Sequence, residues 1–195
     1  MSYKGLSLAA NATAPHLGGN VKAGDPFTYC ASVWNYVIAR FAIHSVMDLG
    51  SGCGNAADYF YKKGLKVVAI EGLAENVQLS LYPAVKHDLT SGPVITKVDL
   101  VHCQEVVEHI DAQYIDNLMD SFLSGRIILM THALPGQGGH HHVNEQPAEY
   151  WINQFERRGC SLLDEDSLRV RQLAANDRAT YMAASGLLFA NNSRI

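Results

Sequence analysis

A glycine-rich segment after a short apolar run is the first place in this sequence where we expect chemistry. The run at residues 45–49 leads into Asp48-Leu-Gly50-Ser-Gly52-Cys-Gly54, in which glycine stands at every second position. Glycine lets the backbone turn tightly and lets a ligand approach without a Cβ in its way. A dinucleotide-binding turn has the spacing GxGxxG and holds a pyrophosphate, which Asp48 would repel. The spacing GxGxG beside a carboxylate therefore favours a ligand that carries a positive charge.

Two more acidic residues follow the next apolar runs. Glu71 comes about twenty residues after the glycines, where a carboxylate at a strand tip can accept both hydroxyls of a ribose. His87-Asp88-Leu89 places an acceptor beside an apolar residue, as the amino group and the ring face of an adenine require. Together with the glycine turn, these contacts span a whole adenosyl ligand.

Alternating helical and strand patterns must position these residues. The predicted helices are at 27–42, 55–63, 74–81, 112–123, 147–158 and 165–174, and the predicted strands are at 45–49, 66–70, 84–87, 98–103, 126–131, 180–182 and 187–190. Strands that alternate with helices indicate an α/β fold with a doubly wound, mostly parallel seven-stranded sheet and helices on both faces. Such sheets bind ligands at the carboxyl ends of their strands.

The sequence predicts one domain with a lead-in segment. Residues 1–26 are rich in Gly, Ala, Asn and Ser and show no sustained period, so we expect a flexible N-terminal arm followed by a single domain at 27–195. The four cysteines, which lack CxxC spacing, are expected to be free thiols, three of them near the core.

Composition excludes several classes of partner. The formal net charge is −4, and no cluster of Lys and Arg offers a surface for a phosphate backbone, so nucleic acid is a disfavoured partner. No stretch is apolar for long enough to span a membrane, and no secretory signal is recognisable, so we expect a cytoplasmic protein. The oligomeric state is left open.

Residues from about 46 to 129 resemble the class I S-adenosylmethionine-dependent methyltransferases. VMDLGSGCG is similar to the first motif of that family, VVAIEG to the second, KHDLT to the third and VDLVHCQEVVEHI to the fourth. The resemblance implies a Rossmann-like methyltransferase fold with S-adenosylmethionine as cofactor. The residues that it implies for cofactor binding are Asp48, Gly50, Gly52, Glu71, Gly72, Asp88, Leu89, Cys103 and Gln104. The segment from Gly138 to Gly159 resembles a subset of small bacterial and phage methyltransferases.

The fourth motif contains Glu105, Glu108 and His109 at positions i, i+3 and i+4, which share one face if the segment is helical. This spacing resembles the ExxEH of small-RNA 2′-O-methyltransferases and ubiquinone-pathway O-methyltransferases, where it supports a divalent ion with a further ligand downstream. The downstream candidates here are His132, His140, His141 and His142. Three interpretations stay open: a structural role, which is favoured, a divalent metal site such as one for Mg²⁺, Mn²⁺ or Zn²⁺, and a general base at His109 or His142.

The resulting hypothesis is methyl transfer to an O or N nucleophile of a small molecule or sugar. His109 and His142 are the candidate catalytic residues, and Tyr29, Trp34 and Trp151 are candidate walls of the acceptor pocket, although such aromatics belong to the core more often. Two other functions are weighed against it. One is a nicotinamide-dependent oxidoreductase, and the other is a non-catalytic regulator or partner subunit that binds S-adenosylmethionine.

Overall fold

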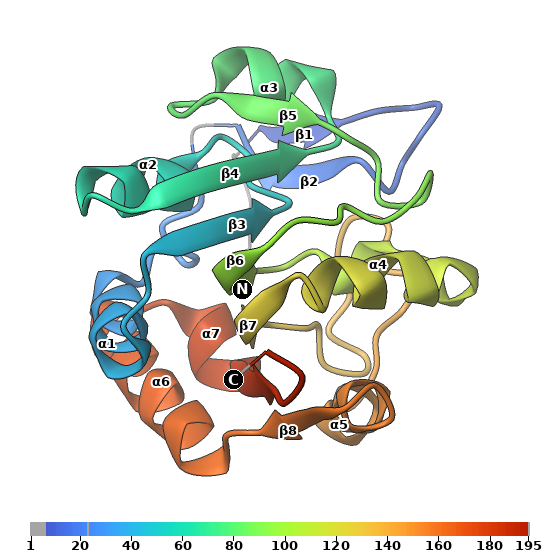
Figure 1. Cartoon of the computed structure of the whole chain (residues 1–195). Helices are drawn as coiled ribbons and strands as arrows, with labels where there is room; N and C mark the ends of the chain where they lie inside the picture. Colours follow the sequence, from blue (N-terminus) through green and yellow to red (C-terminus); the bar gives the residue numbers. More distant parts are fainter. Residues whose placement is uncertain (1–6, 23, 195) are drawn as a thin grey trace.

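The main sheet has seven strands, most of them parallel (Figure 1). A computed structural model describes residues 7–22 and 24–194. The sheet order is β5-β4-β3-β6-β7-β9-β8, with β3 (Ser45–Leu49), β4 (Lys66–Glu71), β5 (Ala84–Lys86), β6 (Val98–Cys103), β7 (Gly125–Met130), β8 (Cys160–Leu162) and β9 (Leu187–Asn191). Strands β3 to β7 pair in parallel, whereas β9 runs antiparallel to both β7 and β8. The predicted α/β class and the mostly parallel seven-stranded sheet are confirmed.

Helices cover both faces of this sheet. They are α1 (Ala31–Phe41), α2 (Asn55–Lys62), α3 (Ala74–Leu79), α4 (Ile115–Phe122), α5 (Ala148–Glu156), α6 (Asp164–Asp177) and α7 (Thr180–Ser185), with short 3₁₀ helices η1 (Val107–His109) and η2 (Ala112–Tyr114). Because side chains alternate along a strand, Met47 and Leu49 of β3 pack with α4 and α5, and Val46 packs with α1, α2 and α6. Asp48 shares the face of Val46, and this places its carboxylate toward α1.

Two late elements differ from the sequence expectations. Residues 180–182, expected to be a strand, begin helix α7, in which Met182 is fully buried against the core. A three-residue apolar run fits a strand and a helical turn equally well, and tertiary packing decides between them. The edge strand β8 was not expected, because its three residues are too few to show a period.

The thiols lie as expected, with Cys30, Cys103 and Cys160 buried and Cys53 partly exposed, and all four are free. No helix within residues 7–22 and 24–194 is long and apolar enough to cross a membrane.

Part of the predicted N-terminal arm has regular structure. Strands β1 (Leu8–Ala10) and β2 (Gly18–Val21) pair antiparallel as a separate two-stranded sheet (Figure 1), and Asn20 of β2 forms a hydrogen bond with Asn76 of α3. Residues 1–6 lie outside the described part of the chain. The flexibility of the arm stays a prediction, but the structure gives residues 8–21 a definite place over the site described next.

Candidate active site

A cavity of about 950 Å³ lies at the carboxyl ends of β3, β4 and β6, with the β1–β2 hairpin along one side. Its wall contains the two candidate catalytic histidines and every residue predicted to bind the cofactor except Cys103. The side chain of Cys103 is fully buried in the core on the other face of β6. Topology therefore brings together residues that are far apart in the sequence, because the ends of parallel strands share one edge.

Two glycines in the turn after β3, Gly50 and Gly52, have different structural reasons to lack a side chain. Gly50 has a φ of +70°, and a Cβ at this position would overlap the Val106 side chain, so the close approach requires glycine. Gly52 has a φ of +54°, and a Cβ there would have no neighbour within 4 Å among the described residues. The turn therefore presents bare backbone at Gly52 to open space, as a closely approaching ligand requires.

Glu71, at the end of β4, is held by three donors. Its carboxylate accepts hydrogen bonds from the amides of Gly52 at 2.8 Å and Leu73 at 2.8 Å and from the Asn76 side chain at 3.2 Å. Burial raises the pKa of Glu71, and these three donors oppose the rise. An ionised carboxylate has about four acceptor positions. Glu71 is therefore fixed in place and retains capacity for a ligand hydroxyl.

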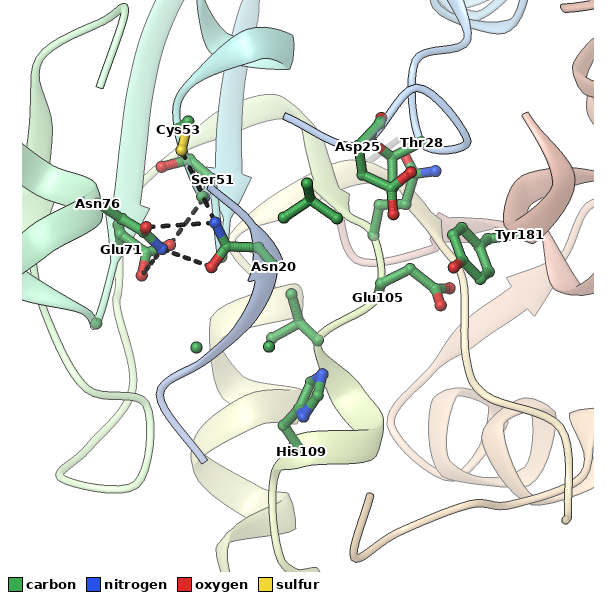
Figure 2. A pocket seen from close by; sticks show the side chains of 18 of the residues that line it. Asn20, Asp25, Thr28, Ser51, Cys53, Glu71, Asn76, Glu105, His109 and Tyr181 are labelled. Atoms are coloured by element: carbon green, nitrogen blue, oxygen red, sulfur yellow. Dashed lines mark hydrogen bonds between the residues drawn. The ribbon is translucent and has the colours of Figure 1, made fainter. Parts of the chain in front are cut away.

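The N-terminal hairpin closes the cavity on the side of Glu71 and Asp88. Asn20 of β2 exchanges hydrogen bonds with Asn76, and Leu17 packs against Gly72 (Figure 2). His16 Nε2 lies 2.9 Å from an Asp88 carboxylate oxygen. Burial alone would raise the pKa of Asp88, but hydrogen bonds from His16 and Thr90 outweigh it and lower this pKa. His16 of the arm therefore contacts Asp88, the candidate adenine-binding residue, directly, whereas Asn20 reaches Glu71, the candidate ribose-binding residue, through Asn76.

The segment of the fourth motif that contains Glu105, Glu108 and His109 is not helical at its start. Glu105 has a left-handed backbone with a φ of +56°, and only residues 107–109 form a 3₁₀ turn. The Glu105 amide donates to Thr131 Oγ1 at 2.8 Å, and that hydroxyl donates to Glu105 Oε1 at 2.7 Å. The condition for a shared helical face of Glu105, Glu108 and His109 is therefore not met, because the chain turns sharply as it leaves β6.

The cavity nevertheless gathers Glu108, His109 and His142, whose ligand atoms lie within 4.8 Å of one another. Glu108 is fully buried, and within the described structure no hydrogen bond of good geometry reaches either of its carboxylate oxygens. The His109 and His142 rings meet edge to face at 5.0 Å, and His142 Nδ1 lies 2.9 Å from the Glu145 carboxylate. One carboxylate and two imidazoles at this spacing could hold a divalent cation.

The same burial shifts the pKa values of the cluster. Burial raises the pKa of Glu108 well above its ordinary value, and the neighbouring Glu105 carboxylate adds to the rise. Burial also raises the pKa of Glu105 to about 7 and lowers that of His109 to about 4. His109 is thus a neutral imidazole near pH 7, which is the form that binds a metal or accepts a proton.

The other downstream histidines have different places. His132 is buried away from the cavity wall, and the wall does not include His141. His140 lines the cavity and lies 3.0 Å from the Pro15 carbonyl oxygen. Only His142 of the four downstream candidates therefore joins Glu108 and His109 among the described residues.

The wall toward α1 and α7 is the candidate acceptor side. It includes Tyr29 and Trp34, as expected, whereas Trp151 is fully buried in the core. Figure 2 shows the side chains of Asp25, Thr28, Glu105 and Tyr181 gathered across the cavity from Glu71 and Asn76. No Lys or Arg of the described chain lines the cavity. Its charged wall residues are therefore carboxylates and histidines.

Several wall residues could not be picked out from the sequence. His16 and Asn20 lie in a segment with no helical or strand periodicity. Asn76 lies on a helix that was predicted only from the spacing of its apolar residues. His102 could have been found, because β3 and β6 are neighbouring parallel strands and Asp48 is paired with His102 in register.

Comparisons with known proteins agree with this geometry. Residues 21–176 match the family described as the methyltransferase domain. The chain is 27% identical over 114 residues to a ubiquinone biosynthesis O-methyltransferase of Rickettsia typhi; this covers 49% of this chain and 46% of the relative. The chain thus matches about half the length of this curated relative.

Two solved structures illustrate the shared fold. The methyltransferase domain of bacterial CtHen1-C has a TM-score of 0.60 at 12% identity, over 84% of this chain and 97% of the other. Magnesium protoporphyrin IX methyltransferase from Synechocystis PCC 6803 was solved with bound S-adenosylmethionine. It has a TM-score of 0.54 at 16% identity, and the match covers 67% of this chain and 66% of the other. With the sheet order, the glycine turn and the family match over residues 21–176, the chain belongs to the methyltransferase domain family and has its Rossmann-like fold.

Proposed function

We propose that the chain is an S-adenosylmethionine-dependent methyltransferase that acts on an O or N nucleophile of a small molecule or sugar. The observation that carries this proposal is the cavity at the ends of β3, β4 and β6, where the bare Gly52 turn, Glu71 and Asp88 line one continuous wall. The proposal includes a cytoplasmic location, and nucleic acid is not the proposed acceptor because the sequence has a net charge of −4.

The wall residues fit the proposed cofactor. Gly52 offers space for close approach, Glu71 would take the ribose hydroxyls, and Asp88 would take the adenine amino group with Leu89 against the ring. Asp48 Oδ2 and Ser51 Oγ are buried beside the turn with no hydrogen-bond partner in the described chain, so a polar ligand there satisfies them. When bound, S-adenosylmethionine supplies an activated methyl group on a sulfonium centre. Gln104 would flank it, and Cys103 would contribute only from the core side.

The chain itself would align the reactants, exclude water and accept a proton. The hairpin from His16 to Val21 covers the cavity, and exclusion of water with close alignment can supply much of about 7–11 kcal/mol of a transfer barrier. His142 lines the cavity, and its Nδ1 faces Glu145, which fixes the ring and leaves Nε2 as the acceptor of the neutral ring. His142 or His109 would take the proton of a hydroxyl or ammonium acceptor.

The direct test is calorimetry of the purified chain with S-adenosylmethionine and with S-adenosylhomocysteine. Saturable heat with both ligands is expected, and no heat with either overturns the proposal. Saturable binding of NADH, followed by fluorescence, would favour a nicotinamide-dependent oxidoreductase. Binding of the donor without methyl transfer to any acceptor in a cell extract would favour a non-catalytic regulator.

His142→Ala is expected to lower turnover by about 10²-fold or more, because it removes the imidazole that contacts both Glu145 and His109. Cofactor affinity should change little. His141→Ala is the matched control, because His141 lies outside the cavity wall. Turnover is measured as S-adenosylhomocysteine release in an extract that contains the acceptor, and an unchanged rate in His142→Ala removes this residue from catalysis.

His16→Ala is expected to strengthen binding of S-adenosylhomocysteine by about 2- to 10-fold. His16 occupies the Asp88 oxygen that the adenine amino group would use, and a hydrogen bond to a charged group contributes about 1.5–3 kcal/mol before allowance for its partial exposure. The measurement is calorimetry, with His44→Ala at an exposed position outside the cavity as control. Weaker binding in His16→Ala would instead assign His16 to the cofactor wall.

A further inference from the structure

A buried polar relay lies between the glycine turn and helix α1. Asp48 of β3 and His102 of β6 are register partners on neighbouring parallel strands, with His102 Nδ1 at 2.7 Å from Asp48 Oδ1. Both side chains are only 3% exposed, and both line the cavity. The third member is Trp34 of α1, whose indole nitrogen lies 3.3 Å from His102 Nε2.

The relay assigns the tautomer of His102. An indole N–H only donates, so His102 Nε2 must accept from Trp34 and cannot carry a proton. The single ring proton is then on Nδ1, which donates to Asp48. The neutral imidazole is enclosed by the Trp34 and Phe60 rings, which meet it nearly edge to face at 5.9 and 5.6 Å. His102 therefore has one orientation and one donor, and the donor is aimed at Asp48.

The relay uses only one of the two Asp48 oxygens. Oδ2 is buried and has no hydrogen-bond partner among the residues that the structure describes. A buried carboxylate oxygen without a partner is costly, and no Lys or Arg of the described wall can reach it. Because Asp48 lines the cavity, a cationic donor on a bound ligand would give Oδ2 the hydrogen-bond partner that it lacks.

We propose that Trp34 and His102 are positioning residues that fix the Asp48 carboxylate at the cavity wall, where Oδ2, which has no partner among the described residues, receives the ammonium group of the amino-acid part of the cofactor. This inference rests on the proposed function, and it assigns recognition of one part of the ligand to one relay. Glu71 and Asp88, on β4 and after β5, lie outside the relay and contact other parts. The relay should therefore affect the amino-acid part and leave the adenosyl part unchanged.

Two ligands separate these parts. S-adenosylhomocysteine contains the ammonium group, whereas 5′-methylthioadenosine keeps the adenosyl and sulfur atoms and lacks the amino-acid part. His102→Gln and His102→Asn form a matched pair: the longer amide reaches the Nε2 position and loses the donor to Asp48, and the shorter one keeps a donor at the Nδ1 position. Trp34→Phe removes the indole donor and keeps an aromatic ring.

Calorimetry on the full chain and its variants tests the proposal. His102→Gln is expected to weaken S-adenosylhomocysteine binding by about 10- to 100-fold, with methylthioadenosine affinity within about twofold of the parent, and His102→Asn should retain most of the affinity for both. An equal loss of affinity for both ligands, or no loss for either, overturns the proposed positioning role of His102. If the parent chain binds neither ligand, the proposed function itself has failed.

A second measurement starts from the parent chain and uses Trp34→Phe only for comparison. Nitrogen-15 NMR of labelled histidines in the parent chain should show one buried ring that is neutral, with its proton on Nδ1, and whose Nε2 signal changes in Trp34→Phe. A proton on Nε2 of that ring, or a doubly protonated ring near pH 7, contradicts the proposal.

Discussion

Glu71→Ala is expected to weaken binding of S-adenosylhomocysteine by about 100-fold or more. The change removes the candidate acceptor of a ribose hydroxyl, and a hydrogen bond to a charged group contributes about 1.5–3 kcal/mol. It also leaves the amides of Gly52 and Leu73 without their acceptor, so the turn that faces the ligand loses its anchor. Both effects act in the same direction, and calorimetry measures their sum.

Glu75→Ala is the matched control for this variant. Glu75 lies four residues further along, in the first turn of α3, where it forms an exposed ion pair with Lys22 at 2.7 Å. Exposed pairs of this kind contribute about 0–1 kcal/mol, so ligand affinity should change by less than about threefold. If Glu71→Ala and Glu75→Ala bind S-adenosylhomocysteine with equal affinity, the ligand lies elsewhere in the cavity. Thermal unfolding of each variant shows that the comparison is made on folded protein.

The cofactor side of the cavity was predictable because it depends on local pattern and topology alone. The turn after β3, the end of β4 and the loop after β5 each follow an apolar run, and parallel strands bring their carboxyl ends to one edge. Asp48, Glu71 and Asp88 could therefore be placed together without a structure. What this reasoning lacks is the direction of each side chain.

Cys103 and His102 illustrate that gap. The family resemblance implies Cys103 beside the cofactor, but side chains alternate along a strand, and β6 aims His102 at the cavity and Cys103 at the core. A one-residue difference along a strand exchanges the two faces. The direction follows only from the pairing of β6 with β3, which sets His102 opposite Asp48.

The arm and the fourth motif were beyond sequence reasoning for other reasons. His16 meets Asp88 across 72 residues, and nothing in a segment without a period predicts such a contact. Glu105 takes a left-handed conformation that residues other than glycine adopt rarely, so a helical pattern was the more natural expectation. Its hydrogen bonds to Thr131, on the loop after β7, hold this conformation in place.

Glu108→Gln separates the metal interpretation of the cluster around His109 and His142 from the structural one. If the cluster holds a divalent cation, the variant is expected to lose Mn²⁺ or Zn²⁺ binding by at least about 100-fold, because a neutral amide replaces the only anionic ligand of the three. Turnover should fall with it, since the ion would bind the acceptor oxygen and favour its ionised form. Calorimetry with each metal alone measures the affinity, and dialysis against a chelator tests the parent.

The unfolding midpoint of Glu108→Gln also distinguishes the metal interpretation from the structural one. In the metal-free chain both Glu108 oxygens are buried without a hydrogen bond of good geometry, and the pKa of Glu108 is raised by burial and by Glu105. An amide of the same shape carries no charge to bury, so the unfolding midpoint of Glu108→Gln should stay equal or rise. A structural carboxylate would instead show a lower midpoint and no metal binding in the parent. Glu156→Gln, at an exposed site on α5, is the control for the substitution itself.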